Sequence, residues 1–364
     1  MRVTFVLPQA SLAGGIRVCA IYAEHLRSRG HKVFVISTPE LDFTPREKVK
    51  NWLLGRPVHR PAIGPSHFDK VRVEHRVLDR FRPVEDADLP DADVVIATWW
   101  ETAEWVARLS PRKGKRVHLI QHDETQIAYQ PIERVEATWR LPLHRVAVAR
   151  WLAELGEDRY GVTGVKCIPN GVDTTQFFAA EREKQIVPTM GLMYSKANFK
   201  GVDIALEAFS NASRNVSGLR LVSFGLEAEP TEELPLPPGA VYQSMPKQEH
   251  LRDLYAACDA WLFASRSEGF GLPILEAMAC RTPVLATPAG AAPDLMAGGG
   301  GILVKPQDPM DLSKAIERVA RMTQSQWKIM SDQAFAIAQQ NTWHASCEQF
   351  EQYLNALMEG REAA

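Results

Sequence analysis

The strongest constraint on the fold of this chain is an alternation of short apolar runs with amphipathic runs, which starts at its first residues. "RVTFVLP" (2–8) and "HKVFVIST" (31–38) are β-branched and apolar, while "IRVCAIYAEHLRSRG" (16–30) carries apolar residues at helical spacing. A strand, a helix and a second strand in this order connect parallel strands. The start of the chain therefore predicts a parallel sheet, with Gly30 near the end of the first helix.

The same alternation continues along the chain. Further strand-like runs lie at 92–100, 116–123, 165–173, 186–193, 219–225, 240–245, 259–265 and 282–288. Near Asn170 the pattern pauses in the turn-rich segment "NGVDTTQFFAAEREKQ" before a new series of strands begins. We predict an α/β fold of two doubly wound Rossmann-like domains, 1–168 and 169–342, which face each other across a cleft. Each domain should bind ligands at the carboxyl ends of its strands.

Composition places the chain among globular proteins. Of its 364 residues, 45% are hydrophobic and 24% are charged, and the formal net charge is −2. We find no apolar run of about 18 residues and no leader-like start, and we expect a cytoplasmic protein, with the inner face of the membrane as the alternative location. The five cysteines are scattered and never form Cys-x-x-Cys, which argues against a disulfide framework and a structural zinc site.

The first half of the chain is basic. Residues 1–170 hold 26 Lys and Arg against 21 Asp and Glu, a net +5, which leaves 16 against 23, a net −7, for the remainder. Much of the excess lies in 46–82, where Trp52, Leu53 and Leu54 sit among basic residues. This segment is either a solvated connection or a surface for an anionic membrane or an acidic acceptor.

The segment "SEGFGLPILEAMAC" (267–280) places Glu268 and Glu276 on either side of a Gly-Phe-Gly-Leu-Pro bend. It follows the predicted strand 259–265, and Pro273 suits the first position of a helix. Glu276 would then fall in the first helical turn. Two such carboxylates suit the vicinal hydroxyls of a ribose and of a sugar at opposite ends of a nucleotide-sugar, whereas the simpler interpretation is a surface Glu and a helix-start Glu.

Backbone groups of the same bend could also bind a ligand. The N–H groups of Gly271 and Leu272 would point, together with the helix dipole, toward a bound phosphate. Gly14 and Gly15 open the first helix and offer a second anion site, although a tight turn before a helix explains them too. Neither stretch is a Gly-x-Gly-x-x-Gly fingerprint, so a dinucleotide-dependent enzyme is a poor fit.

These motifs together resemble the retaining GT-B glycosyltransferases, specifically glycosyltransferase family 4, whose mark is two Glu separated by seven residues within an "EGFGLPILE" stretch. The resemblance covers nearly the whole chain. It includes "GGIRV" and "LRSRGHKVFVI" near the start, "CIPNGVDTTQF" at the domain junction, "KGVDIALEAF" (200–209) and "GILVKPQDPMDLSKAI" (301–316). It implies that the amphipathic segment 343–364 is a helix that crosses back to the first domain.

The resemblance also implies roles for single residues. Glu276 would bind the ribose, Glu268 would contact the transferred sugar, and the backbone of Gly269, Phe270, Gly271 and Leu272 would face the donor. Gly14 and Gly15 would lie beside the donor phosphate and the acceptor. Lys200 matches the family lysine that clamps the pyrophosphate, where a cation stabilises charge on the departing nucleotide.

One family position departs from the pattern. The family usually has Gly-Arg-Leu followed closely by Lys-Gly, whereas this chain reads "GLMYSKANFKG", with Leu192 where the arginine is expected. Lys196 and Tyr194 are the candidates for its replacement, and the second phosphate contact stays open.

Three residues of the first domain are candidates for the sugar and the acceptor. His122 ends a predicted strand and matches a family position where an imidazole approaches the sugar, with His118, four residues earlier, as the competitor. Trp99 and Trp100 also end a strand, where either could stack on an acceptor sugar or simply pack in the core.

The resemblance implies glycosyl transfer with retained anomeric configuration, from a nucleotide diphospho-sugar to a hydroxyl of a glycan or a lipid-linked acceptor. We expect no cofactor and no metal, because Asp91 and Asp93 precede a strand and have no second ligand set nearby. We expect contact with a membrane through the basic first domain, but no nucleic-acid partner. The alternatives are a nucleotide-sugar epimerase or phosphorylase of the same fold, and a non-catalytic sugar-binding subunit.

Overall fold

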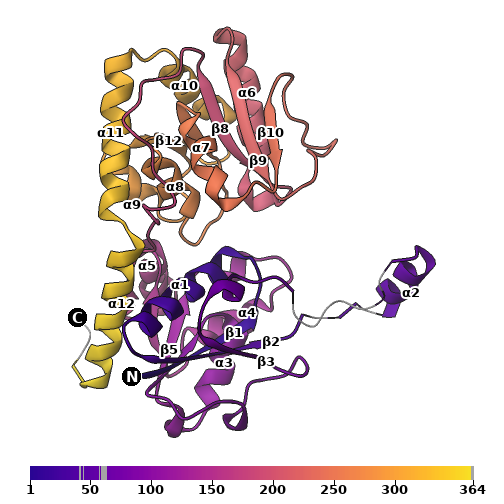
Figure 1. Ribbon diagram of the computed structural model, residues 1–364, viewed down its shortest axis with the longest axis vertical. Helices are drawn as coiled ribbons and strands as arrows, with labels where there is room; N and C mark the ends of the chain where they lie inside the picture. The colour runs from indigo at the N-terminus through magenta and orange to yellow at the C-terminus, as the bar shows by residue number, and fades with distance from the viewer. Residues whose placement is uncertain (41, 44, 57, 59–63, 362–364) are drawn as a thin grey trace. The chain divides into compact units, whose positions relative to one another are not determined.

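The computed structural model describes residues 1–40, 42–43, 45–56, 58 and 64–361 (Figure 1). The chain folds into two compact units. The N-terminal unit holds Met1–Val148, Leu152–Ile168 and the residues from Cys347 onward, and the C-terminal unit holds Ala149–Trp151 and Pro169–Ser346. Apart from the short segment Ala149–Trp151, the chain passes to the C-terminal unit after Ile168 and returns at Cys347, within its last helix.

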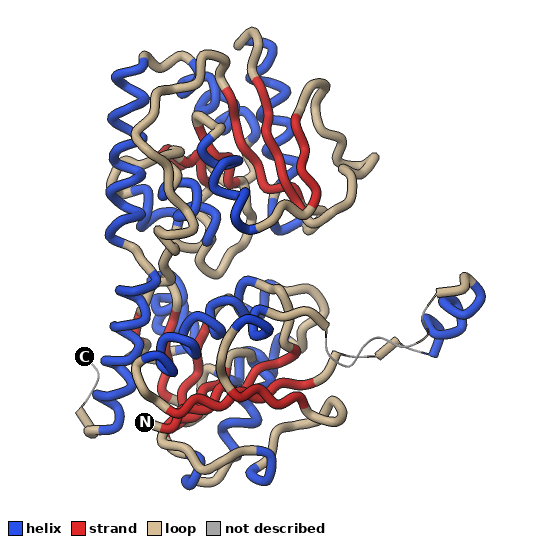
Figure 2. The backbone as a smooth tube through the Cα atoms, viewed as in Figure 1, coloured by secondary structure: helices blue, strands red, loops and turns tan. Residues whose placement is uncertain are grey.

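Among the described residues, the N-terminal unit contains a seven-stranded sheet in which every pair of neighbours is parallel (Figure 2). Its order is β3 (Glu74–Val77), β2 (Lys32–Thr38), β1 (Arg2–Gln9), β4 (Val94–Ala97), β5 (Lys115–Ile120), β6 (His144–Ala147) and β7 (Lys166–Cys167). The order reverses between β1 and β4, as it does in a doubly wound sheet.

Helices cover both faces of this sheet. They are α1 (Gly14–Ser28), α3 (Trp100–Arg108), α4 (Ile132–Thr138), α5 (Arg150–Tyr160) and α12 (Trp343–Met358), whereas α2 (Pro45–Leu53) has no buried residue. On one face, Val6, Ile36 and Val95 form a core with Val106 of α3. On the other face α1 packs against α12, where Tyr22 stacks on Phe350 with ring centroids 4.3 Å apart.

The C-terminal unit, which lies wholly within the described residues, has a six-stranded parallel sheet. Its order is β10 (Val241–Ser244), β9 (Arg220–Gly225), β8 (Thr189–Tyr194), β11 (Ala260–Phe263), β12 (Val284–Ala286) and β13 (Gly301–Leu303). Its helices are α6 (Val202–Asn215), α7 (Leu251–Ala256), α8 (Leu272–Ala279), α9 (Ala292–Met296), α10 (Pro309–Ala320) and α11 (Gln324–Gln340). This sheet also reverses its order once, between β8 and β11.

Strand alternation assigns the two faces of the C-terminal sheet. Leu192 and Leu262 belong to a core that α6 and α10 complete through Phe209 and Ile316. Successive strand residues point to opposite faces, so Trp261 lies on the other side, where its ring is 4.4 Å from that of Tyr255 on α7. Both faces are therefore apolar, as a parallel sheet between two helical layers requires.

The two-domain α/β prediction is confirmed, and the differences concern short strands. The sequence prediction lacked β3, β6 and β13, which have four, four and three residues. β3 ("EHRV") is polar and half-exposed, and "GIL" in β13 starts at Gly301, the last of four consecutive glycines. Such runs are too short for a period to appear. Gly30 has φ 89° and lies two residues after α1 ends.

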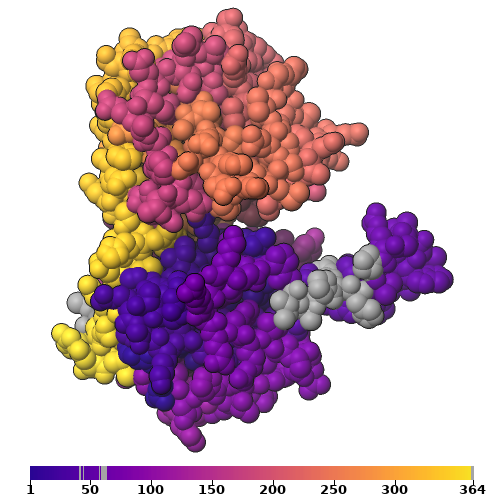
Figure 3. Space-filling view, viewed as in Figure 1, coloured from indigo at the N-terminus to yellow at the C-terminus, as the bar shows by residue number. Residues whose placement is uncertain are grey.

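A single carboxylate ties α12 to the start of the N-terminal unit. Glu351 Oε1 lies 2.9 Å from His31 Nε2, and Arg29 donates to Oε2 at 3.2 Å. His25 Nε2 lies 3.5 Å from the same Oε2. In the space-filling view the yellow C-terminal helix lies against the indigo first residues (Figure 3). Burial raises the pKa of Glu351, but the hydrogen bonds from His31 and Arg29 outweigh it, and the pKa is lowered overall.

This lowered pKa gives a stability prediction with a defined sign. A carboxylate whose pKa is lower in the folded state stabilises the fold above its unfolded pKa, and the contribution is lost as the pH falls. We expect Glu351→Gln to lower the free energy of unfolding at pH 7 by about 1–2 kcal/mol, the scale of one or two hydrogen bonds of this kind. Urea unfolding at several pH values measures it.

The matched control is Glu348→Gln, which removes the same charge from an exposed position of the same helix. We expect it to change stability by less than about 0.5 kcal/mol. The difference between wild type and Glu351→Gln should shrink as the pH falls below about 4.5. A difference that stays constant from pH 7 to pH 4 would show that the Glu351 charge does not hold α12.

Candidate functional site

The order reversal of the C-terminal sheet defines where a ligand can bind. The chain leaves β8 toward β9 on one side and leaves β11 toward β12 on the other. The loops that follow these two neighbouring strands therefore diverge at the carboxyl edge of the sheet, and open α/β sheets bind ligands in the crevice at such a point. Lys200 lies in the loop after β8, and Glu268 lies in the loop after β11.

These two residues contact each other directly. Lys200 Nζ donates a hydrogen bond of 2.6 Å to Glu268 Oε1, and the side chains are only 19% and 11% exposed. The buried Ser265, two residues after β11, donates from Oγ to the same oxygen at 2.9 Å. An ammonium group carries three donors, so one bond to Glu268 does not exhaust the capacity of Lys200. The structure thus places a positive and a negative group side by side at this crevice.

Backbone geometry holds the Lys200 loop against the end of β11. Gly201 has φ 62°, and a Cβ built on it would lie 1.9 Å from the carbonyl oxygen of Ala264, so only glycine fits. Arg266 donates to both carboxylate oxygens of Asp203, at 2.8 and 2.6 Å, and to the carbonyl oxygen of Asn198 at 2.6 Å. These interactions link the two loops that carry Lys200 and Glu268.

A second glycine sets the start of α8. Gly271 has φ 94°, and a Cβ there would lie 2.8 Å from Phe263 Cζ. The helix begins at Leu272, so Pro273 is its second residue and not its first. Glu276 is consequently the fifth residue and lies in the second turn, which corrects our placement of it in the first turn. Glu276 therefore projects from the body of α8 and not from its first turn.

The backbone between Glu268 and α8 has fixed neighbours in the same unit. The carbonyl oxygen of Gly269 accepts a hydrogen bond of 2.8 Å from Trp151 Nε1, and that of Phe270 accepts one from Ala291 N, also at 2.8 Å. The side chain of Phe270 is 4% exposed, so this residue can offer a ligand its backbone but not its ring. The loop is rigidly supported, as a site that positions a substrate requires.

Glu276 is nearly buried, with 7% of the residue exposed. The hydroxyl of Tyr255 donates to Glu276 Oε2 at 2.9 Å. Neither Tyr255 nor Ser265 was predicted as a site residue. The signal for Ser265 was its place at the end of a strand, and the sequence held no local signal for Tyr255, which lies 21 positions from its partner.

The structure narrows the search for the second phosphate contact. Leu192 is 2% exposed and belongs to the apolar core, so an arginine at this position would be buried in the sheet. Tyr194 is also buried, and its hydroxyl donates to the carbonyl oxygen of Leu234 and accepts from Thr231 N. The hydroxyl of Tyr194 is thus engaged in the fold, and Lys196, which is exposed in the loop after β8, is the remaining candidate.

The N-terminal sheet has its own order reversal, between β1 and β4. Gly14 and Gly15 begin α1 after β1. Gly15 lies against the side chain of Gln121: a Cβ built on Gly15 would be 3.3 Å from Gln121 Nε2. Trp99 follows β4 and caps α3. Three of the predicted residues thus lie at the carboxyl edge of this sheet, where a ligand is expected.

The two histidines near β5 differ in exposure. His118 is inside the strand and 5% exposed, and burial, followed by the nearby Arg145, lowers its pKa to about 3. It is therefore neutral at ordinary pH and out of reach of a substrate. His122 lies two residues beyond β5, is half-buried, and its Nδ1 is 2.9 Å from the carbonyl oxygen of Asp123.

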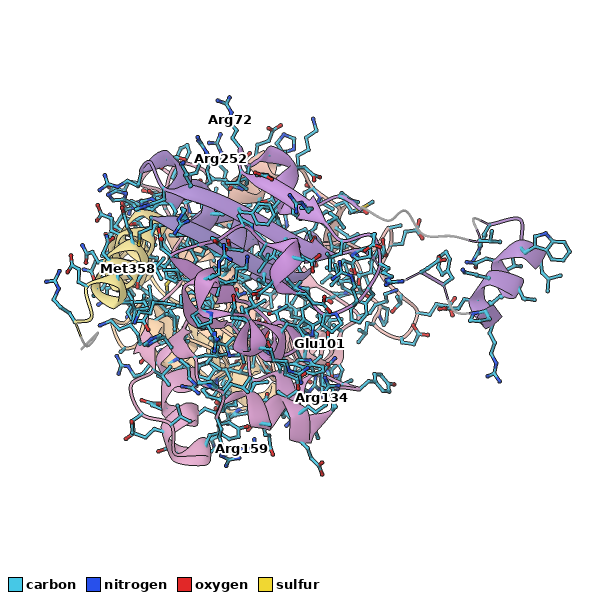
Figure 4. All side chains as sticks on the ribbon, turned by 90° about the horizontal axis from the view of Figure 1, so that it is seen from below. Arg72, Glu101, Arg134, Arg159, Arg252 and Met358 are labelled. Atoms are coloured by element: carbon cyan, nitrogen blue, oxygen red, sulfur yellow. The ribbon has the colours of Figure 1, made fainter. Side chains whose placement is uncertain are left out.

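The two tryptophans also differ. Trp100 is 3% exposed, its Nε1 donates to Gln130 Oε1, and Arg134 lies over its ring at 4.7 Å. Figure 4 shows Arg134 near Glu101, the residue that follows Trp100 in the chain. A ring so covered has almost no surface for a sugar, so the structure does not support Trp100 as an acceptor residue. Trp99 is half-buried and stays a prediction.

Both carboxylates of the Asp91-x-Asp93 pair take part in ion pairs. Asp93 accepts from Arg2 at 2.7 Å, while Asp91 accepts from Arg112 at 2.8 Å and from Lys113 at 3.1 Å. They anchor the start of β1 and the turn before β5. These ion pairs give both carboxylates a structural role.

Two family models match the chain, one in each half. "Glycosyltransferase Family 4" matches residues 13–176, and "Glycosyl transferases group 1" matches residues 184–322. The D-inositol 3-phosphate glycosyltransferase of Corynebacterium jeikeium is 38% identical over 101 residues, which span 28% of this chain and 24% of that relative. The enzyme of the same name from Acidothermus cellulolyticus is 26% identical over 359 residues, 86% of this chain and 79% of its own length.

A solved structure supports the fold over the full length. The Anabaena protein Alr3699/HepE in complex with UDP has a TM-score of 0.72 at 17% identity, over 98% of this chain and 100% of that one. At this identity the likeness concerns the fold alone. Together with the family models and the residues assembled at the two sheet edges, it leads to one assignment: this chain is a group 1, family 4 glycosyltransferase of GT-B fold.

Proposed function

We propose that this protein is a retaining glycosyltransferase that moves a sugar from a nucleotide diphospho-sugar to a hydroxyl of a glycan or a lipid-linked acceptor. The observation that carries the proposal is the Lys200–Glu268 pair at the order reversal of the C-terminal sheet, with Glu276 on the adjoining helix. The UDP bound to Alr3699/HepE, a protein of similar fold, supports a nucleotide as the ligand.

Each of these groups has a defined task in the proposed reaction. Lys200 stabilises the negative charge that develops on the departing diphosphate, helped by the backbone N–H groups of Gly271 and Leu272. Glu276 accepts hydrogen bonds from the ribose hydroxyls, and Glu268 contacts the transferred sugar. We propose that a phosphate oxygen of the donor takes the proton of the acceptor hydroxyl, so that attack occurs on the face that the nucleotide leaves.

The N-terminal unit provides the acceptor side in this proposal. Gly14 and Gly15 offer backbone N–H groups, His122 approaches the sugar, and Trp99 contacts the acceptor. Lys196 is proposed as the second phosphate contact in place of the family arginine. We propose that no metal ion is needed, because Lys200, Lys196 and the backbone donors supply the positive potential that a divalent ion supplies elsewhere.

The ribose role of Glu276 is testable by binding. We expect Glu276→Ala to weaken binding of the preferred nucleotide, among UDP, GDP, ADP and dTDP, by about tenfold or more, because it removes a charged hydrogen-bond acceptor. Isothermal titration calorimetry measures the change. The control is Glu207→Ala on the exposed face of α6, which should leave the dissociation constant unchanged. Unaltered affinity in Glu276→Ala would rule out its ribose role.

The role of Lys200 can be tested by measuring the rate of sugar transfer. We expect Lys200→Ala to lower kcat for sugar transfer, or for slow donor hydrolysis without acceptor, by about 100-fold, the usual effect of losing one group that stabilises transition-state charge. Activity should persist in the presence of a metal chelator. The proposal fails if the wild type neither transfers nor hydrolyses any common nucleotide-sugar, or if Lys200→Ala retains full kcat.

We also propose that α2, together with Leu54 and Arg56 after it, contacts an anionic membrane. No residue of this helix is buried, Trp52 and Leu53 are 72% and 70% exposed, and Lys48 and Lys50 stand beside these apolar residues. An apolar stripe beside basic residues suits the interface of an anionic bilayer. Within the part of the chain that the structure describes, none of the helices combines the length and the apolar character of a transmembrane span.

Vesicle binding tests the membrane contact. Neutralising Lys48, Lys50 and Arg56 together to Gln should weaken binding to phosphatidylglycerol vesicles at least roughly tenfold, since each basic residue near such a surface contributes about 1 kcal/mol. Binding to phosphatidylcholine vesicles should be weak for both proteins. The control is Lys314→Gln with Arg318→Gln, on the exposed side of α10. Equal sedimentation of the triple variant and the wild type would refute the contact.

A further inference from the structure

The buried hydrogen bond between Tyr255 and Glu276 is not explained by the roles assigned so far. Tyr255 is fully buried, and its hydroxyl donates to Glu276 Oε2 at 2.9 Å. Glu276 lies in the second turn of α8, and Tyr255 lies near the end of α7. The hydrogen bond therefore comes from a neighbouring helix and fixes the direction of a carboxylate that is itself nearly buried.

The tyrosine is held by more than this bond. Its ring lies 4.4 Å from that of Trp261 and meets Phe224 edge-on at 5.7 Å. Its carbonyl oxygen accepts a hydrogen bond of 2.8 Å from Thr282 Oγ1. The hydroxyl can thus act as a fixed donor, because the ring cannot turn without displacing β11 and β9 side chains.

A fixed donor matters for a carboxylate that must bind two adjacent hydroxyls. A hydrogen bond from a neutral donor to a carboxylate stabilises the charged form in a buried site and restricts its rotation. A carboxylate has about four acceptor positions, and the bond from Tyr255 to Oε2 takes up one of them. Small errors in the position of such a group cost much of its effect on a ligand.

We propose that Tyr255 is the positioning residue of the ribose site: its hydroxyl orients Glu276 so that the carboxylate meets the 2′ and 3′ hydroxyls of the donor nucleotide. The inference rests on the proposed function, since it assumes that Glu276 binds ribose. Tyr255 itself touches no ligand, and its effect passes entirely through Glu276. It should therefore be visible only with ligands that carry the ribose hydroxyls.

The test compares ribonucleotides with analogues that lack these hydroxyls. UDP, GDP and ADP and their 2′,3′-dideoxy counterparts are titrated into the wild type, Tyr255→Phe, Glu276→Gln and the double variant by calorimetry. Tyr255→Phe keeps the packed ring and removes only the hydroxyl. Tyr160→Phe is the matched control, because it removes the hydroxyl of a buried tyrosine from the N-terminal unit.

We expect Tyr255→Phe to weaken binding of the preferred ribonucleotide about tenfold, the scale of a hydrogen bond to a charged group. The affinity for the dideoxy analogue should change by less than about twofold. In the Glu276→Gln background the tyrosine substitution should have little further effect. Tyr160→Phe should behave as the wild type with both ligands.

Two results would overturn the inference while leaving the proposed function standing. One is a Tyr255→Phe protein that binds the ribonucleotide and its dideoxy analogue as tightly as the wild type does. The other is an equal loss for both ligands, which would indicate a general structural role. A wild type that binds neither these six ligands nor dTDP would overturn the proposed function, and this inference with it.

Discussion

The ion pair between Lys200 and Glu268 is the interaction on which the site in the C-terminal unit depends. Both side chains are largely buried, and a charged group in such a place is costly unless a partner of opposite charge and further hydrogen bonds compensate it. Ser265 supplies one such bond to Glu268. Removing either charge would leave the other buried and unpaired, so the two loops that carry them must form the site together.

The sheet topology explains why these two residues meet although 68 positions separate them. They follow the two strands on either side of the order reversal, which brings their loops to one crevice. Gly201 permits the close approach of the first loop, and Gly271 permits the turn into α8 on the second. The N-terminal sheet repeats the arrangement with Gly14, Gly15 and Trp99 at its own reversal. One topological rule therefore places the candidate residues within each unit.

Much of this could be predicted from the sequence, because the fold follows from local patterns. Alternating apolar and amphipathic runs predicted two doubly wound domains, and Glu268, Lys200 and Glu276 stood in recognisable motifs at strand or helix ends. What the sequence did not predict depends on interactions between distant segments. The helix starts at Leu272, so Glu276 lies in its second turn. Arg134 lies over the ring of Trp100, and the hydroxyl of Tyr255 donates to Glu276 from another helix.

Leu192 is a residue whose place the sequence motif did not predict correctly. A comparison by motif made this residue look like a missing phosphate contact, whereas the structure shows a core residue of β8. The strand continues to Tyr194, so the ligand-facing edge begins only at the following residues, and Lys196 stands there. Pattern alone does not locate the end of a strand to within two residues, and here two residues separate the buried Tyr194 from the exposed Lys196.

We expect a nucleotide diphosphate to bind at the order reversal of the C-terminal sheet. Hydrogen–deuterium exchange, measured with and without the best-binding nucleotide among UDP, GDP, ADP and dTDP, tests it most directly because it reports which backbone segments the ligand protects. We expect slower exchange in residues 195–201 and 265–276, with the segments of β12 and β13 unchanged. Protection confined to other segments, with both of these exchanging as before, would exclude this binding site.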